Sequence, residues 1–255
     1  MPIAAWGVAA PLVPLPGGHR NLVFRTVGLT RDLVFKTTRR SEAALRWLGP
    51  VQAAACQAGL AVPALIPARS GSLSCAGWTC EPLLEGIVAD PVKTRGLEAA
   101  LGRFHDLTAR MAQRPGFRSS RALLGCRSGG DVDLDAMPVA VVALCRAAWR
   151  SVAGARCAAI HGDVSRSNLL RCPDGRIALL DWDEARRDLR GFDTLACGTA
   201  APGLVRAALA WEVACCWRAE PARARRLARK LAVVSRAEPG SSRALRPRSA
   251  TAARS

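Results

Sequence analysis

The segment HGDVSRSNLLRCPDGRIALLDWD, residues 161–183, carries the most specific pattern in this chain of 255 residues. Its Pro-Asp-Gly stretch at 173–175 is a strong turn signal between two apolar runs. Residues 169–172 and 177–180 are therefore predicted to pair as a short antiparallel hairpin. Polar side chains that flank the two runs are then brought to the open end of the hairpin.

Two oxygen-bearing side chains are expected to meet at that open end. If Cys172 faces Ile177, the register places Asn168 opposite Asp181. Amide and carboxylate oxygens on an otherwise apolar support suit a magnesium ion that is shared with the phosphates of a nucleotide. Asp163, on the preceding loop, is predicted to lie near that metal without binding it. This position suits a base that orients an acceptor hydroxyl and takes its proton.

The N-terminal part of the sequence indicates a small antiparallel sheet that is interrupted by one helix. Residues 12–38 contain an apolar stretch and two strand-like runs, separated by turns. Ser41 is a candidate N-cap for the helix that follows. Strand-like segments return at 62–66 and 78–84. This order of strands, helix and strands predicts an α+β fold.

The rest of the chain has a helical pattern. Apolar residues within 97–107 and 137–152 recur at helical spacing. We therefore predict an N-terminal lobe at 1–86, which ends in a hinge, and a helical lobe at 87–235. Residues 236–255 are rich in Arg, Ala and Ser, and they are predicted to form a disordered basic tail.

The net charge is +17, because 37 Lys and Arg residues outnumber 20 Asp and Glu residues. The basic residues are spread along the chain and are not interleaved with aromatic residues, so nucleic acid is not the expected partner. Lysine occurs only at positions 36, 93 and 230, so a lysine at a chemically demanding position is informative. Lys36 is such a lysine, because it lies on the last strand-like run of the N-terminal set.

The sequence predicts a cytoplasmic protein without a membrane partner. No uninterrupted apolar run reaches the roughly 18 residues that span a bilayer. The apolar residues 1–18 lack a basic n-region and contain four prolines, which argues against a signal peptide. Ten cysteines occur without a CxxC pair or zinc-ligand spacing, a pattern that favours reduced thiols over a secreted disulfide framework.

The segment quoted above resembles the HGDxxxxN and DxD motifs of the aminoglycoside phosphotransferase and choline kinase family, small-molecule kinases with a protein-kinase-like fold. The resemblance implies two lobes, a small antiparallel-sheet N-terminal lobe and a mainly helical C-terminal lobe. It implies that Asp163 is the catalytic base and that Asn168, Asp181 and Asp183 bind Mg²⁺. Asp193 resembles the structural aspartate of the family on the following helix.

The start of the chain resembles the same family. Gly17 and Gly18, before a strand, resemble the loop that covers the phosphates of the nucleotide, although a Gly-Gly pair is equally typical of an ordinary turn. Lys36 resembles the phosphate-binding lysine of the family. Glu42 resembles the helix glutamate that pairs with that lysine.

The segment 81–86 resembles the hinge that binds adenine through backbone groups, which assigns Glu81 and Leu83 to nucleotide binding. The implied cofactors are ATP and Mg²⁺. Two histidines have structural interpretations instead. His161 is expected to anchor its loop, because the adjacent carboxylate already supplies the base, and His105 is expected to pack on an apolar helix.

These patterns predict an ATP-dependent small-molecule O-phosphotransferase that transfers the γ-phosphate to a hydroxyl group. Two other hypotheses stay open. One is a catalytically silent relative that binds nucleotide, which would be expected to lack Asp163, Asn168 or Asp181, yet all three are present. The other is a basic protein that binds nucleic acid through its arginines.

The charge balance predicts a neutral or anionic acceptor, provided that the pocket shares the basic character of the whole chain. The alternative acceptor is a polycation such as an aminoglycoside, which needs clustered carboxylates. Carboxylates that would form such a cluster by pointing inward are Asp131, Asp133, Asp135 and Glu212.

Overall fold

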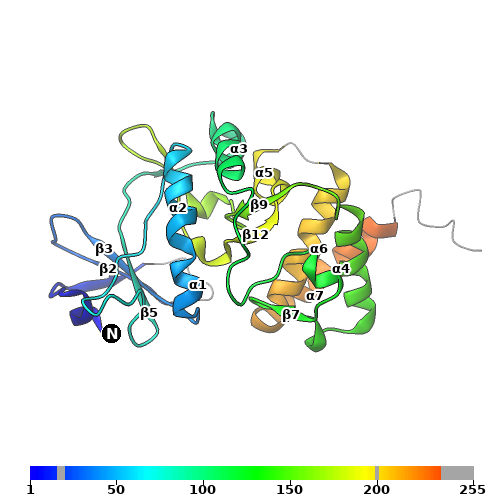
Figure 1. Ribbon diagram of the computed structural model, residues 1–255, viewed down its shortest axis with the longest axis horizontal. Coiled ribbons are helices and arrows are strands. Elements are labelled where there is room, and N and C mark those ends of the chain that lie inside the picture. Colours follow the sequence, from blue (N-terminus) through cyan, green and yellow to red (C-terminus); the bar gives the residue numbers. More distant parts are fainter. Residues whose placement is uncertain (16–20, 199–200, 237–255) are drawn as a thin grey trace, which may run out of the picture.

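The computed structural model describes residues 1–15, 21–198 and 201–236, which Figure 1 shows as two lobes side by side. Strands dominate the N-terminal lobe and helices dominate the other. Gly17 and Gly18, predicted to cover the phosphates, lie outside these ranges, and so does the predicted tail beyond Arg236.

An antiparallel sheet of four strands forms the N-terminal lobe, as the sequence predicts. In spatial order its strands are β1 (Leu12–Pro14), β2 (Val23–Thr26), β3 (Leu33–Thr37) and β5 (Trp78–Pro82). Alternation along β3 buries Phe35 completely on one face, where the ring of Trp6 meets it edge-on. Trp6 belongs to the 3₁₀ helix η1 (Ile3–Trp6). Lys36 lies on the other face of the sheet.

Two short helices follow β3. The first, α1 (Glu42–Arg46), begins after Ser41, whose Oγ accepts a hydrogen bond from the Ala44 N–H at 3.3 Å. The predicted N-cap is therefore confirmed. The second, α2 (Leu48–Gln57), contains Pro50 in its first turn, where a helix needs no N–H donor.

Residues 62–66, predicted to be a strand, form none. Pro63 has no N–H to donate to a ladder, and Pro67 ends the segment in the same way. The contact with the sheet is made by Ile66, whose N–H donates to the Cys80 carbonyl at 2.8 Å. The predicted strand at 78–84 is present as β5.

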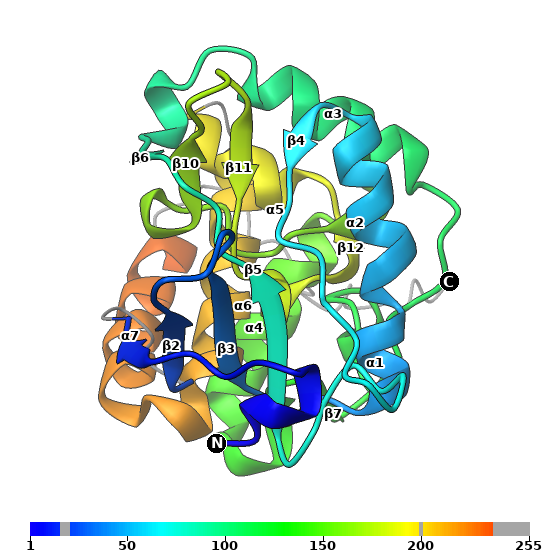
Figure 2. The same ribbon diagram turned by 90° about the vertical axis from the view of Figure 1, so that its left-hand side faces the viewer.

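A second sheet joins segments from both lobes. Its order is β4 (Leu60–Ala61), β11 (Ile177–Leu179), β10 (Leu169–Arg171) and β6 (Ile87–Val88), and Figure 2 shows β4 beside the β10–β11 hairpin. One apolar cluster combines side chains from α2, β4, α3 (Leu97–Leu107) and the hairpin: Leu48, Val51, Leu60, Leu97, Leu101, Phe104, Leu169, Leu179 and Trp182. Residues on both sides of the predicted boundary at residue 86 therefore share a hydrophobic core.

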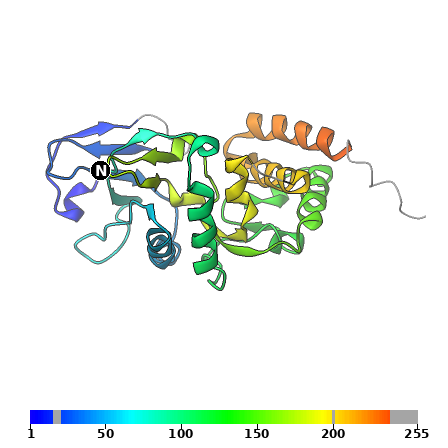
Figure 3. The ribbon, with the colours of Figure 1, turned by 90° about the horizontal axis from the view of Figure 1, so that it is seen from above.

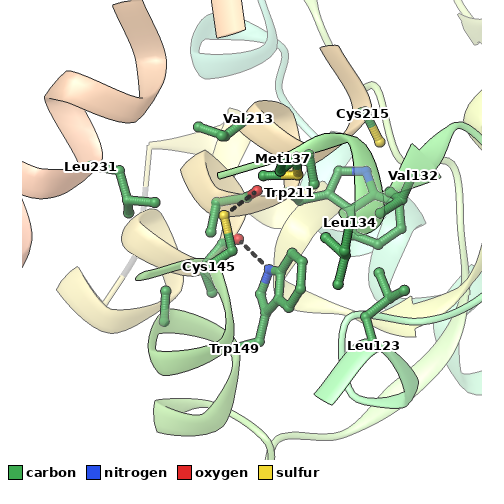
Figure 4. Packing of buried hydrophobic residues seen from close by; sticks show 14 of the residues in the cluster. Leu123, Val132, Leu134, Met137, Cys145, Trp149, Trp211, Val213, Cys215 and Leu231 are labelled. Atoms are coloured by element: carbon green, nitrogen blue, oxygen red, sulfur yellow. Dashed lines mark hydrogen bonds between the residues drawn. The ribbon is translucent and has the colours of Figure 1, made fainter. Parts of the chain in front are cut away.

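Helices make up most of the C-terminal lobe. They are α3, α4 (Val139–Ser151), α5 (Gly191–Thr194), α6 (Pro202–Ala219) and α7 (Pro221–Arg236), and Figure 3 shows α7 lying along α6. The helices predicted within 97–107 and 137–152 are present as α3 and α4. Figure 4 shows the core of this lobe, where the Trp149 indole donates to the Ala207 carbonyl at 3.2 Å. This contact fastens α4 to α6.

The remaining elements of the C-terminal lobe are short. The strands are β7 (Ser128–Gly129), β8 (Val132–Asp133), β9 (Cys157–Ile160) and β12 (Arg186–Leu189). The single-turn helices are η2 (Pro91–Lys93), η3 (Ala122–Leu124), η4 (Leu134–Ala136), η5 (Arg166–Asn168), η6 (Trp182–Glu184) and η7 (Leu195–Cys197). The predicted α+β class is confirmed. Within the described ranges, no helix has the length and apolar character needed to cross a membrane.

Candidate active site

The loop that carries Asp163 is fixed where it leaves the buried strand β9. Asp193, at the start of α5, accepts hydrogen bonds from the N–H groups of His161 at 2.9 Å and Gly162 at 2.8 Å. Gly162 has φ +87°, and a Cβ atom there would lie 2.7 Å from Nη1 of Arg186. Only glycine satisfies both conditions. Asp163 therefore follows a rigid section of backbone.

Both histidines reinforce this loop. His161 Nδ1 accepts from the Asp163 N–H at 3.2 Å, so Nε2 carries the proton that bonds the Leu180 carbonyl at 2.7 Å. His161 anchors the loop, in line with the expectation. His105 is buried, as expected, and also bonds Asp193 at 2.9 Å. Burial raises the pKa of Asp193, but the hydrogen bond and charge of His105 outweigh that effect and hold the pKa below its ordinary value.

Asn168 and Asp163 are directly bonded. Asn168 Nδ2 donates to Asp163 Oδ2 at 2.8 Å and to the Asp163 carbonyl at 3.0 Å. Both partners are acceptors, so the amide nitrogen must face Asp163. Asn168 Oδ1 is consequently the atom that remains for a cation.

The β10–β11 hairpin forms as predicted, but with a register shifted by one residue. Ile177 pairs with Arg171 rather than with Cys172. The register shifts because the turn contains three residues. A hydrogen bond from the Cys172 N–H to the Arg176 carbonyl, at 2.9 Å, closes this turn. Gly175 supplies the positive φ, +83°, that this turn requires.

The shifted register places Asn168 opposite Leu180, whose N–H donates to the Asn168 carbonyl at 2.8 Å. Asp181 comes one residue later and has a left-handed backbone, with φ +57°. The side chains of Asn168 and Asp181 still line one cleft. The predicted juxtaposition therefore survives the register error.

Lys36 reaches from β3 to Asp181 and forms an ion pair with it. Burial lowers the pKa of Lys36, but the carboxylates of Asp181, Asp183 and Glu81 outweigh that effect and hold the pKa above its ordinary value. Lys36 is therefore charged. Glu81, on β5, lines the same cleft, and burial together with Asp181 raises its pKa to about 7 against the opposing charge of Lys36.

Glu42 does not reach Lys36, so the predicted pairing is wrong. Its carboxylate accepts hydrogen bonds from the Leu73 N–H at 3.1 Å and the Ser72 hydroxyl at 2.9 Å. Glu42 is the first residue of α1, and it comes so soon after β3 that it faces the 70–74 loop instead. The small cavity beside Lys36 is lined from the helices by Leu45 of α1 and by Leu48 and Gln52 of α2, and Gln52 is the polar side chain among these three.

The hinge presents a different backbone group from the one predicted. The Leu83 N–H donates to the Asp32 carbonyl at 2.9 Å and continues the β3–β5 ladder that includes Glu81. Neighbouring residues of a strand direct their backbone groups to opposite edges. The groups that point away from β3 are therefore those of Pro82 and Leu84, and the assignment of Glu81 and Leu83 as the backbone contacts is corrected. Of the hinge segment 81–86, residues 81–84 line the cleft.

Asp183, predicted to bind metal, is held by Arg40, a residue that the sequence analysis missed. Arg40 donates to the two oxygens of Asp183 at 3.0 and 2.8 Å and to those of Asp131 at 2.8 and 2.7 Å. Burial raises the pKa of Asp183, but Arg40, with Lys36 and Arg114, outweighs that effect and holds the pKa below its ordinary value. Nothing in the local sequence distinguishes Arg40 from the other arginines.

A cleft of about 440 Å³ is lined by residues of both lobes. Its far wall is formed by α6 and the start of α7, through Trp211, Glu212, Cys215, Cys216, Glu220 and Arg223. Of these side chains, Glu212 was a predicted candidate. The others had no recognisable motif, because α6 is apolar around most of its circumference.

Carboxylates outnumber cations among the described residues of the cleft: Glu81, Asp163, Asp181, Asp183, Glu184, Glu212 and Glu220, against Lys36 and Arg223. The expectation that the pocket shares the positive charge of the chain is therefore wrong for this lining. The excess of carboxylates in the cleft does not come from the predicted acidic cluster. Its members Asp131, Asp133 and Asp135 pair with Arg40, Arg218 and Arg127, respectively.

The donor set fits Mg²⁺. In the described part of the chain, no group of three or more His, Cys, Asp or Glu side chains is assembled to hold a metal. Asn168 Oδ1 and the Asp181 carboxylate are hard oxygen donors, the type that Mg²⁺ prefers, and they would hold the ion beside the phosphates of a nucleotide. Asp183 fits less well, because both of its oxygens already accept hydrogen bonds from Arg40.

Residues 11–228 match the model of a family described as the phosphotransferase enzyme family. A macrolide 2'-phosphotransferase from Brachybacterium faecium has 18% identity and a TM-score of 0.56, over 90% of this chain and 95% of that one. An aminoglycoside phosphotransferase mutant, in complex with ADP and hygromycin B, has 14% identity and a TM-score of 0.61, over 94% and 98%. A choline kinase from Streptococcus pneumoniae has 11% identity and a TM-score of 0.56, over 91% and 97%. No curated protein sequence matches significantly. The common feature is the two-lobed protein-kinase-like fold.

Proposed function

Because the chain belongs to the phosphotransferase enzyme family, we propose that it transfers the γ-phosphate of ATP to a hydroxyl group of a small molecule. The observation that carries the proposal is the convergence of four side chains on one cleft: Lys36, Asp163, Asn168 and Asp181. ADP bound to the related aminoglycoside phosphotransferase supports a nucleotide as the donor.

Asp163 is the proposed catalytic base. Its Oδ2 atom accepts a hydrogen bond from Asn168, which fixes the plane of the carboxylate and leaves Oδ1 to face the acceptor. A carboxylate held in this way would align the incoming hydroxyl and take its proton as the new oxygen–phosphorus bond forms, while the bond from the γ-phosphorus to the bridging oxygen breaks and ADP leaves.

Asn168 and Asp181 are the proposed ligands of Mg²⁺, which neutralises the charge on the phosphates when it is bound. Lys36 supplies a further positive charge from the rigid strand β3. Its ammonium group forms an ion pair with Asp181. When a nucleotide binds, its phosphate oxygens would replace that carboxylate as the partner of Lys36, and Asp181 would be available as a metal ligand.

The hinge recognises adenine through the Leu84 N–H as donor and the Pro82 carbonyl as acceptor. Because the Leu83 N–H bonds Asp32 of the neighbouring segment, the backbone groups of the residues on either side of Leu83 face the opposite edge of the strand. The pyrrolidine ring of Pro82 removes one donor from this edge. The proposal therefore rests on a single backbone donor at the hinge, which is Leu84.

The acceptor is proposed to be a hydroxyl compound that carries at least one ammonium group. Beyond Asp163, the wall of the cleft presents Glu184, Glu212 and Glu220, and Arg223 is the cation there among the described residues. A focused local field of this kind attracts a cation even inside a basic protein. The hygromycin B complex and the choline kinase among the similar structures support the same class.

The test is a panel of hydroxyl compounds incubated with ATP and Mg²⁺, with ADP formation as the readout. The panel contains aminoglycosides, choline, ethanolamine, a macrolide and uncharged sugars. We expect turnover with at least one amino or quaternary ammonium alcohol, and turnover about 10³-fold lower with the Asp163→Ala variant. Nucleotide binding without turnover on any acceptor would favour the catalytically silent relative.

A further inference from the structure

Arg40 connects the two lobes directly. It lies on the segment between β3 and α1, four positions after Lys36, and its side chain is 11% exposed. Its guanidinium group binds two carboxylates of the C-terminal lobe at once, with Asp131 at 2.7 Å and Asp183 at 2.8 Å from Nη2. Arg40 donates four hydrogen bonds, two to each carboxylate, and one ammonium group with three donors cannot reproduce them.

A second arginine makes the reverse connection. Arg114, from the C-terminal lobe, is 1% exposed and donates to the Ala44 carbonyl of α1 at 3.0 Å. It also donates to the Asp183 carbonyl at 2.8 Å. Both guanidinium groups lie over the ring of Phe117, that of Arg40 at 4.9 Å and that of Arg114 at 4.5 Å from the ring centroid. Side chain and backbone of Asp183 are thus both fastened to this pair of arginines.

These contacts fix the backbone conformation of Asp181. Its left-handed backbone, φ +57°, is disfavoured for a residue with a Cβ atom, so neighbouring contacts must maintain it. On one side, the Leu180 carbonyl accepts the His161 Nε2 proton at 2.7 Å. On the other side, Asp183 is held by Arg40. The candidate magnesium ligand is therefore fixed between two anchored residues.

We propose that Arg40 is a positioning residue, which holds Asp183 as an anchor and not as a metal ligand and thereby orients Asp181 into the cleft. The role of Asp181 in this inference rests on the proposed function. The anchoring of Asp183 by Arg40 does not.

For each variant, titration calorimetry measures the dissociation constant of AMP-PNP once with Mg²⁺ and once with EDTA. The constant measured with EDTA, divided by the constant measured with Mg²⁺, is the ratio that reports how much the metal strengthens nucleotide binding. We expect Arg40→Ala and Asp183→Asn each to lower that ratio by about tenfold, as loss of an outer-shell partner does, and their combination to lower it no further. Asp181→Ala is expected to abolish the metal dependence.

Two control variants separate positioning from other effects. Arg39→Ala removes the same charge from the adjacent exposed position and is expected to leave the ratio unchanged. Arg40→Lys keeps the charge without the fork, and it is expected to behave like Arg40→Ala. A lysine variant with the wild-type ratio would overturn the bridging argument.

Two further outcomes refute the proposal. If Arg40→Ala lowers the melting temperature but not the ratio, the residue is merely structural. If Asp183→Asn abolishes metal dependence as Asp181→Ala does, Asp183 is a ligand. A wild-type chain whose ratio is one would refute the proposed function instead. The melting temperatures of the same variants then decide the anchoring, because additive losses from Arg40→Ala and Asp183→Asn would exclude it.

Discussion

Asn168 directs its amide nitrogen at Asp163, 2.8 Å from Oδ2 and 3.0 Å from the carbonyl oxygen. One amide thereby performs two tasks, because its nitrogen orients the candidate base while its oxygen remains for the metal. Removal of the Asp163 side chain leaves the second of these hydrogen bonds in place. Asp163 is therefore a position where chemistry can be separated from nucleotide binding.

We expect Asp163→Ala to reduce kcat by about 10³-fold, since the general base is lost. The dissociation constant of Mg²⁺-AMP-PNP should stay within about threefold of wild type, because Asn168 keeps its bond to the backbone. Single-turnover ADP formation and calorimetry measure the two effects. Ser165→Ala, on the same loop, is the matched control. A turnover near that of wild type would remove Asp163 from the mechanism.

Arg223→Ala should improve binding of cationic acceptors. Arg223 now pairs with Glu212 at 2.7 Å and with Glu220 at 3.2 Å, so it occupies carboxylates that an ammonium group would use. The expected fall in KM for a diamine acceptor is about fivefold, a modest factor because the Arg223 side chain is 42% exposed. Arg226→Ala, on the exposed side of α7, should change nothing. An unchanged KM would show that the acceptor binds elsewhere.

Asp193→Asn should destabilise the fold in a pH-dependent way. The folded-state pKa of Asp193 is depressed, so its contribution is present above the unfolded-state pKa near 3.8 and is lost as the pH falls through the folded-state pKa. At pH 7 the expected loss is about 3 kcal/mol, because a buried pair is broken. Urea unfolding at pH 7 and below pH 4 measures the difference. If the difference in the free energy of unfolding between wild type and variant stays constant over this pH range, the lowered pKa of Asp193 in the folded state is contradicted.

Gly162→Ala and Gly175→Ala form a matched pair. Both glycines have left-handed backbone, at φ +87° and +83°, but a Cβ meets Arg186 at 2.7 Å only at position 162, and nothing lies within 4 Å at 175. The Gly175 change should cost about 1 kcal/mol and the Gly162 change about 3 kcal/mol or more. Equal losses in the free energy of unfolding would show that the catalytic loop adapts to the added methyl group.

The sequence predicted those parts of the site that depend on neighbouring residues. Asp163, Asn168 and Asp181 lie within one segment, and its turn signal brought them together even though the register was wrong by one residue. The register error has a local cause, since Gly175 permits a turn of three residues and a spacing rule does not reveal which turn forms.

Other parts of the site depend on contacts between distant segments. Arg40 meets Asp131 across 91 positions of the chain, and no local pattern marks either residue. The prediction that Glu42 pairs with Lys36 was wrong because of the chain geometry around it. It has the residue type that pairs with a lysine, but the short connection from β3 to α1 turns it toward Leu73. The prediction from the net charge was wrong as well, because among the described residues of the cleft Arg223 is the one arginine, whereas seven carboxylates line it.

The hydrophobic core shared between the lobes also bears on how this chain is made. Leu48, Val51 and Leu60 leave the ribosome early, but Leu179 and Trp182, which complete their cluster, are synthesised more than a hundred residues later. Helix α3 can cover part of the apolar surface of α2 and β4 soon after they are made, but the rest stays exposed until Leu179 and Trp182 have been synthesised. The core of the N-terminal lobe is therefore complete only after the candidate catalytic segment has been translated.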